Sequence, residues 1–132
     1  MEFLSEGTRT GKIATVREDG SPHVVPIWFI IDDGDIVFTT WHESVKLKNL
    51  ASNSRAAMVT DLEEPPYAYV SVEGRISISD DLDELKDYAT RIGGRYMGAD
   101  RAGEFGERNG VPGEVVVRLH IDKIIAKDEM TE

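Results

Sequence analysis

Residues 36–50 read IVFTTWHESVKLKNL, an apolar β-type run that gives way to a helical pattern within a few residues. The run ends in Thr39 and Thr40, and the helical pattern opens with Ser44 as its expected N-cap and Lys46 in its first turn. A helix N-terminus offers unpaired backbone N–H groups and the positive end of the helix dipole. The hydroxyl groups add hydrogen bonds and Lys46 adds a full charge. We therefore interpret this junction as a candidate phosphate-binding site.

The alternative for this junction is an ordinary capped surface helix. In that case Lys46 would oppose the helix dipole, at a cost of up to about 1 kcal/mol. A bound anion would remove this cost. The lysine therefore favours a ligand site, but the plainer interpretation stays open at this point.

The composition of the chain excludes several classes of protein. The 132 residues suffice for one domain with its own core, and the absence of cysteine removes disulfides and thiolate chemistry. The formal net charge of −10 argues against binding to nucleic acids or to anionic membranes. No apolar run approaches the ~20 residues of a membrane span, and the first residues lack the apolar core of a secretory signal. We expect a cytoplasmic protein.

Short β-type runs separated by turn signals dominate the chain. The patterns predict strands at 10–16, 22–31, 36–40, 55–61, 67–79, 114–121 and 123–126, and helices at 44–52, from 80–81 to about 97, and at 100–108. Short hairpin connections favour antiparallel pairing. The whole chain, 1–132, is therefore predicted to form one mainly β domain, an antiparallel barrel of six or seven strands with peripheral helices.

A few residues carry local predictions. Pro26 lacks an N–H group and marks an edge, a bulge or a lapse in pairing. Gly74 indicates a bulge or a close approach within its strand. Gly93 and Gly94 are expected to weaken or break the long helix. Trp28 is expected in the core.

Other catalytic or metal chemistry has little support in the sequence. His23, His42 and His120 lie on separate elements without the spacing of a metal site. No Gly-x-Ser-x-Gly motif occurs, and nothing in the sequence orders serine and histidine as a triad. Paired carboxylates fall in turns, where solvated side chains are ordinary. We expect no metal site and assign no catalytic side chain.

Two long stretches resemble a known family. Residues 20–76 (GSPHVVPIWFIIDDGDIVFTTWHESVKLKNLASNSRAAMVTDLEEPPYAYVSVEGRI) and 91–119 (RIGGRYMGADRAGEFGERNGVPGEVVVRL) resemble the split β-barrel, FMN-binding-like oxidoreductases of the pyridoxamine 5′-phosphate oxidase-like superfamily. Within it, the chain is most similar to the branch that binds coenzyme F420, a deazaflavin. The resemblance runs from about residue 11 to residue 126.

The resemblance implies a homodimer with two cofactor sites at the subunit interface. The implied cofactor-binding residues are Thr39, Thr40 and Trp41 beside the strand end, Ser44 and Lys46 on the phosphate, Asn49 one turn on, His23, Val24, Val25 and Pro26 along the ring, and Tyr67 and Tyr69 from the other subunit. Pyridoxamine phosphate oxidases carry an arginine where this chain has Val45. The loss of that cation favours F420 over FMN, which is the alternative cofactor.

The implied function is an oxidoreductase that passes a hydride from reduced F420 to an unsaturated or conjugated small molecule. The alternatives are an FMN oxidoreductase of the same fold, a non-catalytic carrier or sensor of the cofactor, and a dimeric interaction module without a ligand. The glutamate tail of F420 requires cations, and the candidates are Lys48, Arg55, Arg91, Arg95 and Arg101.

Overall fold

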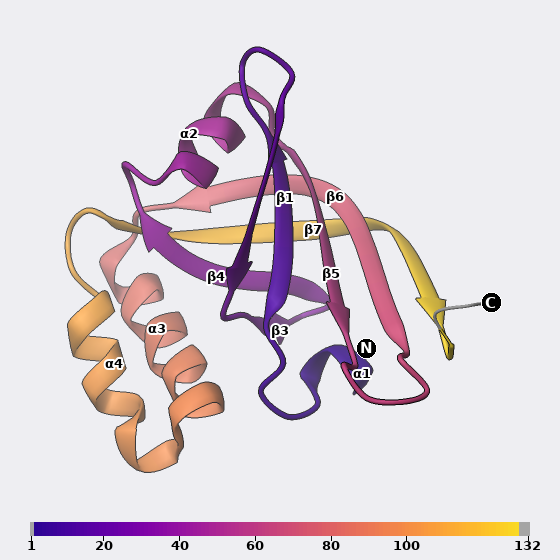
Figure 1. Ribbon diagram of the computed structural model, residues 1–132. Helices are drawn as coiled ribbons and strands as arrows, with labels where there is room; N and C mark the ends of the chain where they lie inside the picture. The colour runs from indigo at the N-terminus through magenta and orange to yellow at the C-terminus, as the bar shows by residue number, and fades with distance from the viewer. Residues whose placement is uncertain (1, 130–132) are drawn as a thin grey trace.

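The computed structural model describes residues 2–129, and Figure 1 shows their arrangement. The strands are β1 (Gly11–Val16), β2 (Pro22–Ile27), β3 (Ile30–Asp32), β4 (Asp35–Trp41), β5 (Arg55–Asp61), β6 (Tyr69–Ser79) and β7 (Glu114–Lys127). The helices are α1 (Glu2–Ser5), α2 (Val45–Ser52), α3 (Leu82–Met97) and α4 (Ala102–Asn109), with a 3₁₀ turn, η1 (Ala99–Arg101), before α4.

All the strands belong to one antiparallel sheet with the order β2-β1-β5-β6-β7-β4-β3. Hairpins join β1 to β2, β3 to β4 and β5 to β6, while β7 returns from the end of the chain to lie between β6 and β4. The sheet is strongly curved, and helices lie at its margins (Figure 1). The prediction of a mainly β, antiparallel fold with peripheral helices is confirmed.

The interior of the curved sheet holds the main core. Alternate residues of neighbouring strands point inward, as the period of two requires, and the fully buried ones include Ile13, Phe38, Met58, Val72 and Leu119. A second cluster joins α3 to the outer face of β4 and β7; its members include Val37, Leu85, Tyr88, Ile92 and Val116. The helix therefore covers one part of the sheet's outer face.

Several element boundaries differ from the predictions. The run 22–31 is two strands, because the chain leaves the sheet at Trp28 and Phe29. The two runs after residue 113 form a single strand, β7, and α1 was not anticipated. Pro26 lies on β2, which is an edge of the sheet, as predicted. The ladder between β6 and β7 shifts register next to Gly74, which confirms the predicted bulge.

The prediction for Trp28 was wrong, and of the two alternatives for Gly93 and Gly94 the break in the helix does not occur. Trp28 is 39 % exposed, because it stacks on Tyr96 of α3 with ring centroids 4.9 Å apart instead of entering the core. The Gly93–Gly94 pair does not break α3. A side chain at Gly93 would place its Cβ atom 2.4 Å from that of Phe105, so the glycine permits the close packing of α3 against α4.

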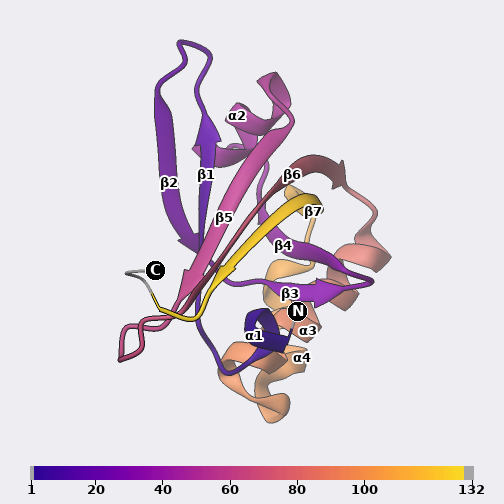
Figure 2. The same ribbon diagram turned by 90° about the vertical axis from the view of Figure 1, so that its right-hand side faces the viewer.

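The two ends of the sheet carry different structures. The β1–β2 turn and α2 lie together at one end, whereas α1 and the β5–β6 loop lie at the other (Figures 1 and 2). No helix among residues 2–129 is long and apolar enough to cross a membrane. The candidate site is built at the α2 end.

Candidate functional site

Helix α2 begins with a complete N-cap. Ser44 has extended backbone angles, and its Oγ accepts a hydrogen bond from the Leu47 N–H at 3.2 Å. The same oxygen accepts a hydrogen bond from the buried Thr40 hydroxyl at 3.1 Å. The predicted helix start and cap are therefore confirmed. Because both contacts use Ser44 as an acceptor, its own hydroxyl proton stays available for an anion.

A buried hydrogen bond fixes α2 to the sheet. The side-chain amide of Asn49 donates to Thr15 Oγ1 at 3.0 Å, and both residues are almost fully enclosed. The Asn49 side chain thus attaches α2 to strand β1. Its contact with the cofactor stays a prediction.

His23, another of the predicted site residues, pairs with Thr15 in the β1–β2 ladder. The Nδ1 atom of His23 is buried and has no hydrogen-bond partner among residues 2–129. A buried ring nitrogen without a partner is costly. This end of the sheet therefore retains hydrogen-bonding capacity that the chain itself does not use.

The opposite charges of Lys46 and Glu114 interact near the start of α2. Burial lowers the pKa of the Lys46 ammonium, and the charge of Glu114 partly opposes this effect. Burial likewise raises the pKa of the Glu114 carboxyl, and Lys46 partly opposes that. Both side chains are half-buried. Partial removal from water makes each charge more responsive to a third charge brought to the same place.

The turn before α2 is held against the start of β7. Trp41 pairs with Glu114 in the β4–β7 ladder, and its ring packs on Gly113. His42 donates its backbone N–H to the Gly113 carbonyl at 2.8 Å. A cavity of about 410 Å³ adjoins this turn; it is lined by His42, Asp80, Leu82, Pro112, Gly113, Glu114 and Val115. The Trp41 side chain is half exposed beside it, at 45 %.

The segment predicted to pass the cofactor ring is the edge strand β2. His23 and Val25 pair with Thr15 and Ile13 and share their inward face, while Val24 and Pro26 lie on the outer face. Val24 is 64 % exposed. One side of this strand has no partner strand in the sheet, so backbone groups there are open to a ligand or to another subunit.

The predicted tyrosines lie at the other end of the sheet. Tyr67 belongs to the β5–β6 loop and Tyr69 opens β6, far from α2 in Figures 1 and 2. Tyr69 lines a cavity of about 460 Å³ together with Lys12, Val59 and Asp61. The single chain therefore brings together the β2, β4 and α2 residues of the predicted site, but not the tyrosines.

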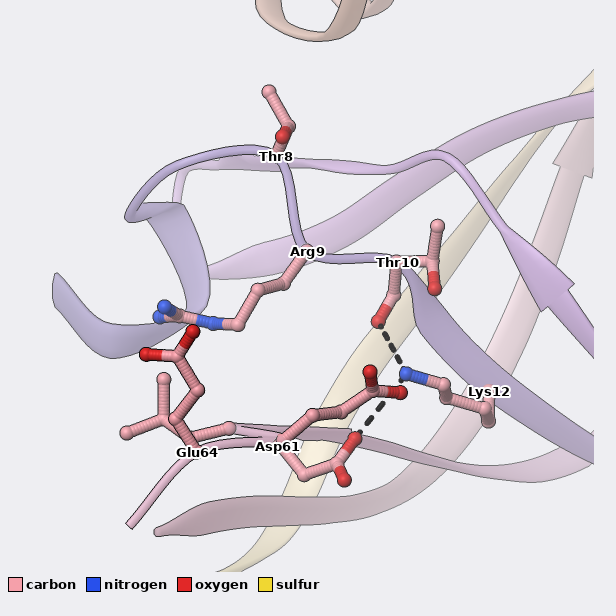
Figure 3. A pocket seen from close by; sticks show the side chains of 8 residues that line it. Thr8, Arg9, Thr10, Lys12, Asp61 and Glu64 are labelled. Carbon is pink, nitrogen blue, oxygen red and sulfur yellow. Dashed lines mark hydrogen bonds and ion pairs between the residues drawn. The ribbon is translucent and has the colours of Figure 1, made fainter. Parts of the chain in front are cut away.

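A second pocket, of about 390 Å³, adjoins that cavity and is drawn in Figure 3. Its lining comes from the segment before β1 and from the end of β5, and comprises Thr8, Arg9, Thr10, Lys12, Asp61, Leu62, Glu63 and Glu64. Lys12 Nζ forms an ion pair with Asp61 Oδ1 at 3.2 Å (Figure 3). Cations and carboxylates are mixed here, so this pocket lacks the positive bias of an anion site.

Most of the candidate tail-binding cations have partners within the chain. Arg95 donates to the carbonyls of Phe29 at 2.6 Å and Leu4 at 2.7 Å, tying α3 to α1 and to the link before β3. Arg91 pairs with Asp32 and Arg101 with Glu104, each at 3.1 Å. These contacts account for the three guanidinium groups without a ligand.

The structure also brings the side chains of Ser77, His120 and Asp35 together in a row, which the sequence did not predict. Ser77 Oγ lies 2.9 Å from His120 Nε2, and His120 Nδ1 lies 3.2 Å from Asp35 Oδ2. The residues come from β6, β7 and β4, so only the strand register reveals them. Acyl transfer also needs donors aimed at the oxyanion. Here the line of side chains lies on a sheet face whose backbone is engaged in the β6–β7 ladder, so we assign it no catalytic role.

Comparisons with known proteins show which family this chain resembles over its length. The family model of pyridoxamine 5′-phosphate oxidase matches residues 1–128. An F420H(2)-dependent biliverdin reductase from Mycobacterium tuberculosis is 27 % identical and aligns with 100 % of this chain and 88 % of its own length.

Among solved structures, the conserved hypothetical protein Rv2991 from Mycobacterium tuberculosis superimposes with a TM-score of 0.85 at 26 % identity, covering 96 % of this chain and 81 % of its own. A structure described as F420 reductase gives a TM-score of 0.75 at 27 % identity, with 94 % of each chain covered.

Proposed function

Since this chain belongs to the pyridoxamine 5′-phosphate oxidase family, we propose that it is a coenzyme F420-dependent reductase. The observation that carries the proposal is the unused binding capacity at the α2 end of the sheet, formed by the Ser44 hydroxyl, the half-buried Lys46 ammonium and the His23 Nδ1 atom, which has no partner among residues 2–129. The similarity to a biliverdin reductase that depends on F420, and to an F420 reductase, supports this cofactor.

The residues at the α2 end fit a phosphate group. Ser44 would donate its hydroxyl proton, the first-turn N–H groups would point at the phosphate oxygens, and Lys46 would supply the charge. An anion at this place would offset the unfavourable desolvation of Lys46. His23, Val24, Val25 and Pro26 would offer backbone atoms to the ring, with Thr39, Thr40 and Trp41 beside it and Asn49 holding the helix.

Bound reduced F420 would supply a hydride from its C5 atom to an unsaturated or conjugated small-molecule acceptor. The chain would contribute position, electrostatics and the exclusion of water. We assign no general acid or base, because the site described above contains no side chain whose place fixes such a role.

The choice between F420 and FMN depends on charge. Val45 occupies the first-turn position at which pyridoxamine phosphate oxidases carry an arginine, so this helix start has one cation fewer. FMN oxidoreduction with the same fold is the second candidate, and a non-catalytic F420 carrier the third. Turnover of reduced F420 with a panel of conjugated acceptors separates an enzyme from a carrier.

We further propose a homodimer in which each cofactor site uses both subunits. The β5–β6 loop and the start of β6, which carry Tyr67 and Tyr69, lie at the opposite end of the sheet from α2 (Figures 1 and 2), so these tyrosines would reach a cofactor at α2 only from the partner subunit. The exposed apolar surface of β2, above all Val24, and its open edge support pairing of two copies. A cytoplasmic location stays a prediction.

Mixed dimers test the proposed function and the shared site together. Lys46→Ala homodimers, and homodimers carrying Tyr67→Ala and Tyr69→Ala, should each lose F420 affinity at both sites. A hybrid of the two variants should regain one intact site, because the unchanged lysine and the unchanged tyrosines then meet at one interface. F420 titration that finds no recovery in the hybrid contradicts the shared site, and wild-type protein that binds no F420 contradicts the proposed cofactor.

A further inference from the structure

Glu114 brings a second charge to the proposed phosphate site. It opens β7 directly opposite Trp41, which lies three residues before the α2 N-cap. His42 holds the two segments together with two hydrogen bonds to the Gly113 carbonyl. Its backbone N–H lies 2.8 Å from the carbonyl oxygen and its ring Nδ1 2.9 Å. Glu114 also lines the cavity of about 410 Å³ beside the turn. A carboxylate is thus held beside the turn that leads into α2, where its charge interacts with that of Lys46.

We propose that Glu114 makes this site selective for a phosphodiester monoanion over a phosphomonoester dianion. The inference rests on the proposed function and deepens it, since it names the residue that determines the charge of the accepted ligand. F420 carries its phosphate as a diester, with one negative charge. FMN carries a monoester, which is mostly doubly charged at neutral pH because its second pKa is about 6.

The reasoning is a charge count. Lys46 supplies one positive charge and the α2 N-terminus a partial one, while Glu114 subtracts a full negative charge. A monoanion leaves this set close to neutral, whereas a dianion leaves an excess negative charge in a half-buried place. One unmatched charge near a protein surface changes an affinity by roughly 3- to 10-fold. Val45 also favours a monoanion, because it is uncharged and so offers no second positive charge to balance Glu114.

A titration with two matched ligands tests the inference. The ligands are the 5′-phosphate of the F420 chromophore and the methyl ester of that phosphate, which share one ring and differ by one negative charge at pH 7.5. The proteins are the wild type, Glu114→Gln, and Glu43→Gln as the matched control. Glu43 lies in the same turn, but its side chain is 67 % exposed. Glutamine keeps the shape of glutamate, and thermal unfolding verifies that each variant is folded.

The wild type should bind the methyl ester more tightly than the free phosphate. Glu114→Gln should raise the affinity for the free phosphate by roughly 3- to 10-fold while that for the ester changes less, so the preference shrinks or disappears. Glu43→Gln should leave the preference within about 2-fold of the wild type, because its charge is solvated. An unchanged preference in Glu114→Gln, or an equal change in Glu43→Gln, overturns the inference.

Lys46→Ala separates this inference from the proposed function. Weaker binding of both ligands to Lys46→Ala, together with an unchanged preference in Glu114→Gln, overturns only the role of Glu114. Unchanged binding of both ligands to Lys46→Ala overturns the phosphate site itself. The inference is supported when Lys46→Ala weakens both ligands and Glu114→Gln shifts their ratio.

Discussion

Two charged regions of this molecule differ in how completely their groups are paired. At the end of β3, the Asp32 carboxylate accepts hydrogen bonds from Tyr88 at 2.6 Å, Arg118 at 3.0 Å and Arg91 at 3.1 Å. Arg118 also pairs with Asp35 at 3.1 Å. At the α2 end of the sheet, by contrast, the charge of Lys46 interacts with that of Glu114 without a hydrogen bond between them, and the buried His23 Nδ1 atom has no partner among residues 2–129.

This difference in pairing distinguishes a region that stabilises the fold from a region that we propose binds the cofactor. A carboxylate with three donors stabilises the fold and has most of its hydrogen-bonding capacity in use. Half-buried polar groups that lack partners among residues 2–129 cost free energy, and the cofactor proposed above would remove that cost. Substitutions in the first region should therefore change stability, and those in the second should change cofactor affinity.

Asp32→Asn should give the largest loss of stability. It removes the charge that holds Tyr88, Arg91 and Arg118, and we expect the free energy of unfolding to fall by about 2–3 kcal/mol, because hydrogen bonds to charged groups are strong and each guanidinium group loses one of its two carboxylate partners. Urea denaturation measures the change. Asp33→Asn is the matched control, since Asp33 is exposed and has a φ of 51° that asparagine tolerates. Equal effects of the two substitutions would contradict the assigned role.

The same carboxylate predicts a response to acid. Hydrogen bonds from Tyr88, Arg118 and Arg91 hold the pKa of Asp32 well below its ordinary value of 3.8. A lowered folded-state pKa gives stability that is present above the unfolded pKa and is lost as the pH falls below it. The stability gap between wild type and Asp32→Asn should therefore be full at pH 6 and narrow below about pH 4. A gap that stays constant down to pH 3 would show that the charge of Asp32 is not responsible.

Ser44→Ala should have a smaller effect on stability and a clear effect on binding. Loss of the N-cap hydrogen bond should lower the free energy of unfolding by about 1 kcal/mol, and loss of the hydroxyl donor should weaken F420 binding. Ser52→Ala, at the other end of α2, serves as the control in urea denaturation and F420 titration. If F420 binds Ser44→Ala as tightly as it binds Ser52→Ala, the hydroxyl does not touch the phosphate.

Arg101→Ala should have the smallest effect. Its pair with Glu104 lies on the surface, where water and salt screen the two charges and an exposed ion pair contributes little to stability. We expect urea denaturation to detect little change and F420 affinity to stay near that of the wild type. A marked loss of affinity would restore Arg101 as a cation for the cofactor tail.

Local sequence patterns predicted what depends on near neighbours. The N-cap at Ser44, the edge position of Pro26 and the bulge at Gly74 each follow from a residue type and its near neighbours. The antiparallel fold followed from the short connections. These features were predictable because the physical cause lies inside the segment that shows it.

Features that depend on long-range register escaped prediction. Arg118 meets Asp32 across 86 positions, and His120 meets Ser77 across 43. The exposure of Trp28 depends on Tyr96 arriving from α3, and the tolerance of Gly93 depends on the approach of Phe105. The resemblance to a family supplied the site residues, but the buried Asn49–Thr15 bond and the neighbouring Glu114 became visible only once the strands were placed.

The most direct test of the account compares Lys46→Ala with Lys48→Ala in binding the 5′-phosphate methyl ester of the F420 chromophore, which has the ring and the phosphodiester but no glutamate tail for Lys48 to contact. Both lysines lie on α2, but Lys46 is half-buried at the helix start while Lys48 is exposed. Because a charge-assisted contact contributes about 1.5–3 kcal/mol, Lys46→Ala should weaken binding of this ligand roughly 10- to 100-fold, and Lys48→Ala should change it by less than about 3-fold. Equal affinity of the two variants and the wild type would contradict the placement of the phosphate at α2.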